Sequence, residues 1–132
     1  MRLVVSGAFP VGAFAIVAAM SFAQGPQARI MRLSPAAVRE LPVNLVKDLQ
    51  RRGCTIPQAG YNKKPNNVIK GEFAKPGQRD WAVLCSIKEV STILVFWNGS
   101  EKNPSAIAPM KDQIYIQASG KSQLLYQGKS VR

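Results

Sequence analysis

The chain has 132 residues, a formal net charge of +11, two cysteines and no histidine. This length leaves room for one domain with one modest core. Without histidine, Ser-His-Asp and Cys-His nucleophilic sites as ordinarily built are excluded, and two cysteines cannot supply the four ligands of a structural zinc site. A strongly basic chain favours polyanionic partners, although these positive charges are spread along the sequence.

Residues 1–23 are expected to be a cleaved secretory signal peptide. A positive start at Arg2 precedes an uncharged apolar run, and Ser21 and Ala23 stand at the small-residue positions of a cleavage site. The run approaches the length that spans a bilayer, so a retained membrane anchor is the alternative, but Pro10 weakens a helix there. We expect a secreted or periplasmic protein with no stable membrane anchor after cleavage, and with no nucleic acid among its partners.

Cys54 and Cys85 are expected to form a disulfide, because an even cysteine count in an exported chain favours pairing. Two buried thiols are the alternative. Closing a loop of about 30 residues would stabilise so small a domain by roughly 2–4 kcal/mol.

The chain after the signal peptide is expected to begin with a flexible lead-in at 24–33. Residues 34–132 then form a single small domain. Its first element is a short helical turn, because Ser34 can cap it and Pro35 suits its first position.

A second and longer helix is predicted at about 42–52. Its apolar residues form a stripe along one side. The cationic Arg51 and Arg52 suit its last turn, and Gly53 suits the position directly after it. The composition of residues 55–67 then predicts a loop.

Beyond that loop the apolar period changes to two, which predicts strands. The predicted strands are 67–73, 80–87, 91–97 and 113–118, with a turn-rich loop at 98–112 and a fifth strand or a helical turn at 122–127. A helix followed by consecutive strands predicts an α+β domain. In that domain the N-terminal helix packs on a small antiparallel sheet of four to five strands built from hairpins.

The turn in the stretch GEFAKPGQRDWAV raises the question of a metal site. Its carboxylates are Glu72 and Asp80, and calcium requires six to eight oxygen ligands. Lys75 beside so few carboxylates would repel a cation. We therefore predict that Glu72, Gly77 and Asp80 form a structural turn without a metal, in which Asp80 accepts hydrogen bonds from turn N–H groups.

The same turn lies within NVIKGEFAKPGQRDWAVLCSIKEVSTILVFWNGS, residues 67–100, which resembles one FG-GAP/VCBS-type repeat, the unit that forms blades of integrin-like β-propellers. The residues that match the family frame are Gly71, Glu72, Phe73, Gly77, Asp80, Trp81, Ala82 and Val83. The resemblance implies a calcium-binding loop leading into a hairpin, but Ala74, Lys75 and Pro76 replace the family's Asn, Gly and Asp. A propeller needs about four blades or more. The unit is therefore embedded in a small domain, part of a longer chain, or assembled from several copies, which leaves oligomerisation open.

The function that we favour is an exported, non-catalytic binding module for an unknown protein or an anionic envelope glycan. Its expected ligand-binding residues are aromatic or cationic, namely Tyr61, Lys63, Lys64, Arg51 and Arg52. Lysine and tyrosine together permit charge pairing and stacking, although a plain solvated loop would have the same composition.

Two other functions stay open. One is a secreted inhibitor of another enzyme, which would also use a disulfide-braced domain with projecting loops. The other is a hydrolase with a carboxylate pair, drawn from Glu72, Asp80, Glu89 and Glu101. We expect neither catalytic residues nor a cofactor.

Overall fold

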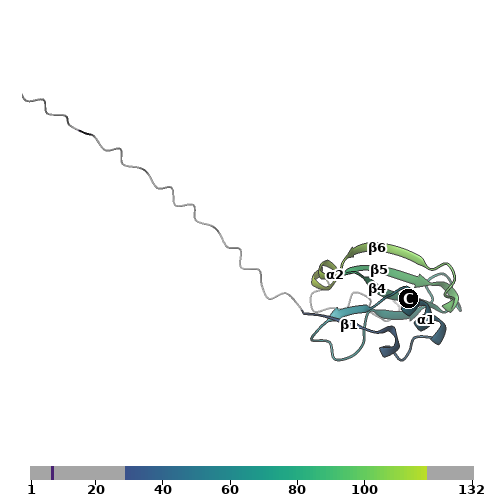
Figure 1. The fold of residues 1–132 in the computed structure, drawn as a ribbon. Coiled ribbons are helices and arrows are strands. Elements are labelled where there is room, and N and C mark those ends of the chain that lie inside the picture. The colour runs from purple at the N-terminus through teal and green to yellow at the C-terminus, as the bar shows by residue number, and fades with distance from the viewer. Residues whose placement is uncertain (1–6, 8–28, 119–132) are drawn as a thin grey trace, which may run out of the picture.

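Two antiparallel sheets make up most of the folded domain (Figure 1). The computed structural model describes residues 29–118 together with Gly7. Its strands are β1 (Ile30–Leu33), β2 (Ile56–Ala59), β3 (Val68–Gly71), β4 (Asp80–Ile87), β5 (Val90–Phe96) and β6 (Ser105–Lys111). Its helices are the α-helices α1 (Val43–Arg51) and α2 (Asp112–Ala118) and the 3-10 turns η1 (Pro35–Ala37) and η2 (Trp97–Gly99).

The larger sheet has the strand order β3-β4-β5-β6, and the smaller sheet joins β1 to β2. A backbone bridge connects the two sheets where Thr55, just before β2, meets Ser86 of β4. There the Thr55 N–H donates to the Ser86 carbonyl at 3.0 Å, and the Ser86 N–H donates to the Thr55 carbonyl at 2.8 Å. In Figure 1, β6, β5 and β4 lie side by side above β1, with α2 and α1 toward opposite ends of the view.

The prediction of an α+β domain with an N-terminal helix is wrong. The described domain is mostly β, in sheets of two and four strands, and its longer helix, α1, lies in mid-chain after β1. Part of the expected lead-in forms β1, and the loops expected at 55–67 and 98–112 contain β2 and β6. Burial does not alternate along any of these three strands, so they form through pairing partners distant in sequence and not through a local pattern of their own.

Strand β6 is an edge strand, which explains why it tolerates Pro109. The register between β5 and β6 shifts between Ser91 and Ile93, so that two residues of β6, Ala108 and Pro109, lie opposite one residue of β5. Ala108 has a φ of 53°, and its carbonyl accepts a hydrogen bond from the Tyr115 hydroxyl. A bulge and a proline at an edge oppose pairing with a further strand.

The predicted fourth strand at 113–118 is also wrong, because this segment forms α2. Tyr115 and Ile116 are both buried while Ile114 is 48% exposed, so burial does not alternate. The element predicted at 122–127 lies outside the described residues.

The remaining elements confirm the predictions from local pattern. The helix predicted at 42–52 is α1, and the strands predicted at 80–87 and 91–97 are β4 and β5, with the strand predicted at 67–73 shortened to β3. Ser34 Oγ accepts from the N–H of Ala36 at 3.4 Å at the start of η1. Gly53 follows α1 with a φ of 77°, which a residue without a side chain adopts readily.

The main core lies between α1 and one face of the larger sheet. The register pairs Trp81 with Phe96 and Val83 with Leu94 across β4 and β5, so these side chains share a face. The core members are Val38, Leu41, Leu45, Leu49, Cys54, Ile56, Trp81, Val83, Cys85, Leu94 and Phe96. Burying each large aliphatic side chain contributes roughly 1.5–3 kcal/mol.

The disulfide between Cys54 and Cys85 is confirmed, with Cα atoms 5.2 Å apart and a sequence separation of 31 residues. It fastens the segment after α1 to the second half of β4. Such a bond is compatible with an oxidising compartment. Within residues 29–118, no helix is long and apolar enough to cross a membrane.

Removing the disulfide is expected to lower the free energy of unfolding by about 3 kcal/mol, because the loop that it closes gains conformational freedom in the unfolded chain. The measurement is urea unfolding of the C54A/C85A variant beside the wild type. Adding a thiol reductant should bring the wild type down to the stability of the variant. A loss of less than about 1 kcal/mol would contradict the expected contribution.

Candidate functional site

A buried carboxylate, Asp112, joins four elements of the fold. Its Oδ2 accepts hydrogen bonds from Arg32 of β1, at 3.2 Å from Nε and 2.9 Å from Nη2, and from the Ser86 hydroxyl of β4 at 2.7 Å. Its Oδ1 accepts from the Ser91 hydroxyl of β5 at 2.6 Å. Asp112 itself is 1% exposed and begins α2. Both hydroxyls therefore serve as donors that hold the carboxylate.

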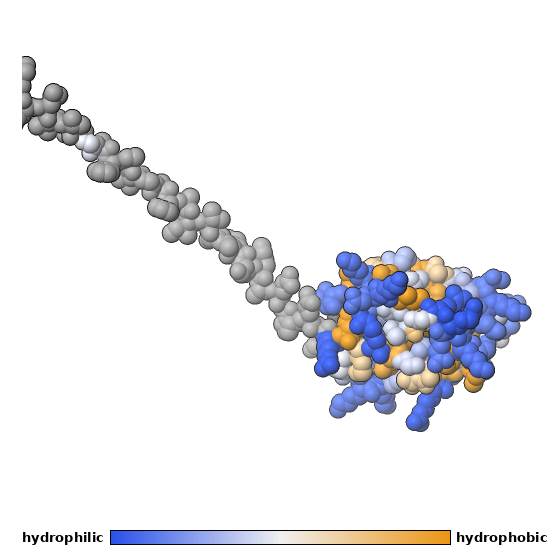
Figure 2. Space-filling model, viewed as in Figure 1, coloured by the Kyte–Doolittle hydropathy of each residue, from blue (hydrophilic) through white to orange (hydrophobic). Residues whose placement is uncertain are grey.

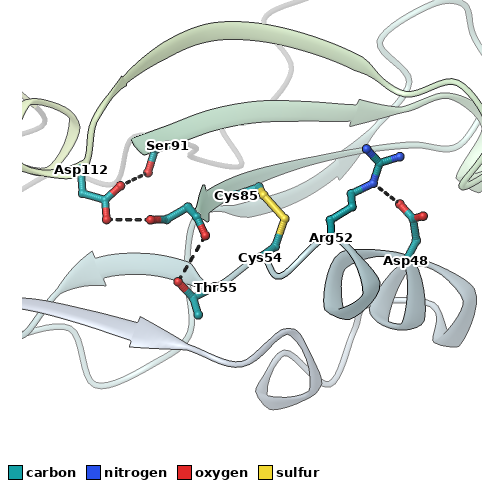
Figure 3. Close-up of a disulfide and its surroundings, with 8 residues drawn as sticks. Asp48, Arg52, Cys54, Thr55, Cys85, Ser91 and Asp112 are labelled. Carbon is teal, nitrogen blue, oxygen red and sulfur yellow. Dashed lines mark hydrogen bonds and ion pairs between the residues drawn. A yellow bond between two sulfur atoms is a disulfide. The ribbon is translucent and has the colours of Figure 1, made fainter. Parts of the chain in front are cut away.

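The hairpin of β4 and β5 explains why the two serines meet one carboxylate. Ser86 and Ser91 are directly paired across the hairpin, so their side chains stand together on one face of the sheet. The N–H of Asp112 donates to the carbonyl of Glu89 in the hairpin turn at 2.9 Å, which brings α2 to this end of the sheet. Figure 3 shows Asp112 and Ser91 on one side of the disulfide and the Arg52–Asp48 ion pair on the other.

A cleft of about 280 Å³ opens beside this cluster, and we name it the β1 cleft. It is lined by Ile30, Arg32, Lys88, Glu89, Val90, Lys111, Asp112 and Gln113. Three of these side chains are cationic. Of the two acids, Asp112 is buried and already paired, so the exposed carboxylate of Glu89 is the one that faces solvent.

A second cleft, of about 460 Å³, adjoins the first and shares Ile30 and Arg32 with it. Its other lining residues are Arg29, Met31 and Gly60. The N–H of Gly60 donates to the carbonyl of Arg29 at 2.6 Å, so the loop after β2 begins against β1. In Figure 2, hydrophilic side chains cover much of the visible face of the domain, and smaller hydrophobic patches lie among them.

The predicted binding loop starts at this second cleft. Tyr61 is 52% exposed, and Lys63 and Lys64 are exposed as well. The buried amide of Gln58 shapes the loop, since its Nε2 donates to the Asn62 carbonyl at 3.2 Å and its Oε1 accepts from a backbone N–H further along at 3.1 Å. The loop is therefore held in place from beneath by one side chain of β2.

Arg51 and Arg52 lie elsewhere, at the end of α1, and both pair with the buried carboxylate of Asp48. Arg52 also lines an apolar groove beside Cys85, whereas Lys64 lines a different groove. Burial raises the pKa of Asp48, but hydrogen bonds from Arg52 and Arg51 outweigh burial and hold the pKa below its ordinary value of 3.8. These two arginines thus stabilise the helix end and do not line the clefts beside β1.

Glu72, in the turn before β4, is exposed, whereas Asp80, paired with Gly71, is buried. The turn is organised around the Asp80 carboxylate. Its Oδ2 accepts from the N–H groups of Phe73 and Ala74 at 2.9 and 3.1 Å. Its Oδ1 accepts from the amide of Gln78 at 2.7 Å and from the backbone N–H after Trp97 at 2.8 Å. Gly77, with a φ of 83°, allows the chain to turn back toward the strand.

This arrangement limits the chemistry of the turn. Four donors point at the Asp80 oxygens, so the carboxylate is engaged as an acceptor and is poorly placed to bind a cation or to act as a general acid or base. Burial raises the pKa of Asp80, but its hydrogen bonds, the one from the Asn98 N–H foremost, hold the pKa below the ordinary 3.8. Over residues 29–118 no three His, Cys, Asp or Glu side chains are grouped to hold a metal.

Comparisons with known proteins return no match for this chain, whether with family models, curated proteins or solved structures. The resemblance of residues 67–100 to an FG-GAP/VCBS repeat therefore stays a prediction. Function has to be inferred from the geometry of this chain.

The sequence alone did not reveal the two clefts. Arg32 lay in the expected lead-in, and Asp112 lay at the end of an expected loop. The one local signal is that Ser86 and Ser91 stand symmetrically about the hairpin turn, but only the register of β4 and β5 makes them neighbours.

Replacing Asp112 by Asn is expected to lower the free energy of unfolding by about 2–4 kcal/mol, because Arg32 and two buried hydroxyls lose a charged acceptor. Each single change S86A or S91A should cost about 1 kcal/mol. Urea unfolding measures all three, with the exposed Glu40→Gln as the control that should change stability little. Equal losses in D112N and E40Q would contradict the structural role of the cluster.

Stability is also expected to fall in acid through Asp48 and Asp80. Since both pKa values are lower in the folded protein than the ordinary 3.8, their stabilisation is present above that pH and is lost as pH falls through the folded pKa values. Unfolding measured from about pH 6 down to about pH 2 should show this loss, because this range takes both carboxyl groups from the ionised to the protonated form. The Asp80→Asn variant should be less stable at neutral pH, and its free energy of unfolding should fall less steeply below about pH 4. A decline as steep as that of the wild type would refute the contribution of Asp80.

Proposed function

We propose that this protein is an exported, non-catalytic module that binds an anionic glycan along β1. The observation that carries the proposal is that two adjoining clefts share Arg32 and are flanked by three further cations, Arg29, Lys88 and Lys111. Against these four positive charges stands one exposed carboxylate, that of Glu89.

The chemistry of these side chains suits acidic sugars. A guanidinium group presents a planar fork of donors that matches a carboxylate. Arg32 is fixed by its pairing with Asp112, so little side-chain entropy is lost when it meets a ligand. Tyr61 follows Gly60 of the second cleft and is 52% exposed, which places an aromatic residue near the cations.

Export favours a glycan over a nucleic acid as the polyanion. The apolar leader at residues 1–23 supports secretion or transfer to the periplasm, and the disulfide suits an oxidising compartment. Charge alone would attract any polyanion, so the proposal depends on cations of these two clefts and not on the total charge.

Binding is expected to depend on where the cations lie. The triple variant R29Q/K88Q/K111Q should bind polygalacturonate about tenfold more weakly than the wild type, since each lost exposed charge contact costs roughly 0.2–1 kcal/mol. The matched control K47Q/K75Q/K102Q removes the same charge from exposed positions outside the clefts and should lose much less. Elution in a salt gradient and titration calorimetry measure both variants.

Equal loss in the two triple variants would mean that only net charge matters and would refute the assignment of the site. Retention of an acidic protein but of no acidic polysaccharide would instead favour a protein partner, such as the target of an inhibitor.

A further inference from the structure

The hairpin turn between β4 and β5 carries a backbone conformation that its residues disfavour. Lys88 and Glu89 have φ values of 50° and 64°, and a two-residue turn of this kind favours Asn-Gly because both positions are left-handed. Strain of this kind in a structure is a pointer to function when the side chains contribute something in return. Both side chains line the β1 cleft, so it is at this cleft that their contribution should be sought.

The Glu89 carboxylate lies close to the one arginine of this cleft. Its Oε1 is 3.5 Å from Nη2 of Arg32, and its side chain is 82% exposed. The same Nη2 donates to the buried Asp112 at 2.9 Å. Arg32 therefore lies between a buried carboxylate that fixes it and a solvent-facing carboxylate that is weakly held, since so exposed an ion pair adds little.

The rest of the cleft can receive an anion. Lys88 in the turn and Lys111 of β6, which is paired with Val90, supply positive charge. Nε2 of Gln113 is a buried donor that has no hydrogen-bond partner within the described part of the chain. A buried amide donor is ordinarily paired, and Gln113 is one of the residues that line this cleft.

We propose that the β1 cleft holds one carboxylate of an acidic sugar on Arg32, and that Glu89 occupies this place in the free protein. The inference rests on the proposed binding of an anionic glycan and names the unit that the cleft recognises. At about 280 Å³ the cleft is slightly smaller than the usual small-ligand pocket of about 300–1,000 Å³, which suits a single sugar unit. Glu89 is thus an internal competitor that a ligand carboxylate must displace.

The experiment compares two variants with the same change in charge. Glu89→Gln removes the competing carboxylate, whereas Glu72→Gln removes an exposed carboxylate from the turn before β4. Binding of trigalacturonate is measured by calorimetry, and its site by amide chemical-shift changes, with neutral galactotriose as a blank. E89Q should tighten binding about threefold to tenfold and E72Q less than twofold, with shifts at residues 88–90.

The outcomes separate this inference from the proposed function. If E89Q and E72Q tighten binding equally, net charge explains the effect and the inference is overturned, while binding to the acidic polymer still stands. If E89Q tightens binding of a sulfated trisaccharide as much, the restriction to carboxylates is overturned. If neither the wild type nor E89Q binds any acidic saccharide, both proposals are overturned.

A further variant tests Arg32 directly. Arg32→Lys keeps the charge but removes the planar fork, and it should weaken trigalacturonate binding at least tenfold. Because Arg32 also pairs with Asp112, the chemical-shift spectrum must first show that the variant is folded. A folded R32K that binds like the wild type would overturn the role of Arg32.

Discussion

The carboxylate of Asp112 is the interaction on which the arrangement of this domain depends. Strand β1 pairs only with β2 among the described residues, and a two-stranded sheet is marginally stable by itself. The side chain of Arg32 attaches β1 to Asp112, and the two serines attach Asp112 to the larger sheet. One buried charge thus adds to the apolar contact that Leu33 of β1 makes with the core.

The ion pair between Asp112 and Arg32 also determines where the Arg32 side chain lies. A buried charge must be paired, so the position of Asp112 obliges Arg32 to lie across the end of the sheet with part of its guanidinium exposed at the cleft. Its side chain is 35% exposed while that of Asp112 is 1% exposed. The buried carboxylate of Asp112 therefore positions the side chain of Arg32, which lines both clefts.

Sequence reasoning succeeded where the signal is local and failed where it depends on distant partners. The apolar stripe of α1 and the apolar runs of β4 and β5 each lie within a short stretch of chain, and the disulfide follows from the presence of two cysteines. Strands β1, β2 and β6 carry no alternation, because β2 is buried throughout and β6 is an edge strand interrupted by Pro109. The candidate site was missed for the same reason, since Arg32 and Asp112 are 80 residues apart.

This separation also relates the site to folding. Strand β1 begins the described chain and α2 ends it, so the β1 cleft exists only when both ends have docked on the central hairpin. Contacts between distant segments form after local ones because closing long loops costs entropy. Asp112 counters this cost by accepting four hydrogen bonds from side chains of three strands, and its N–H holds the turn at Glu89.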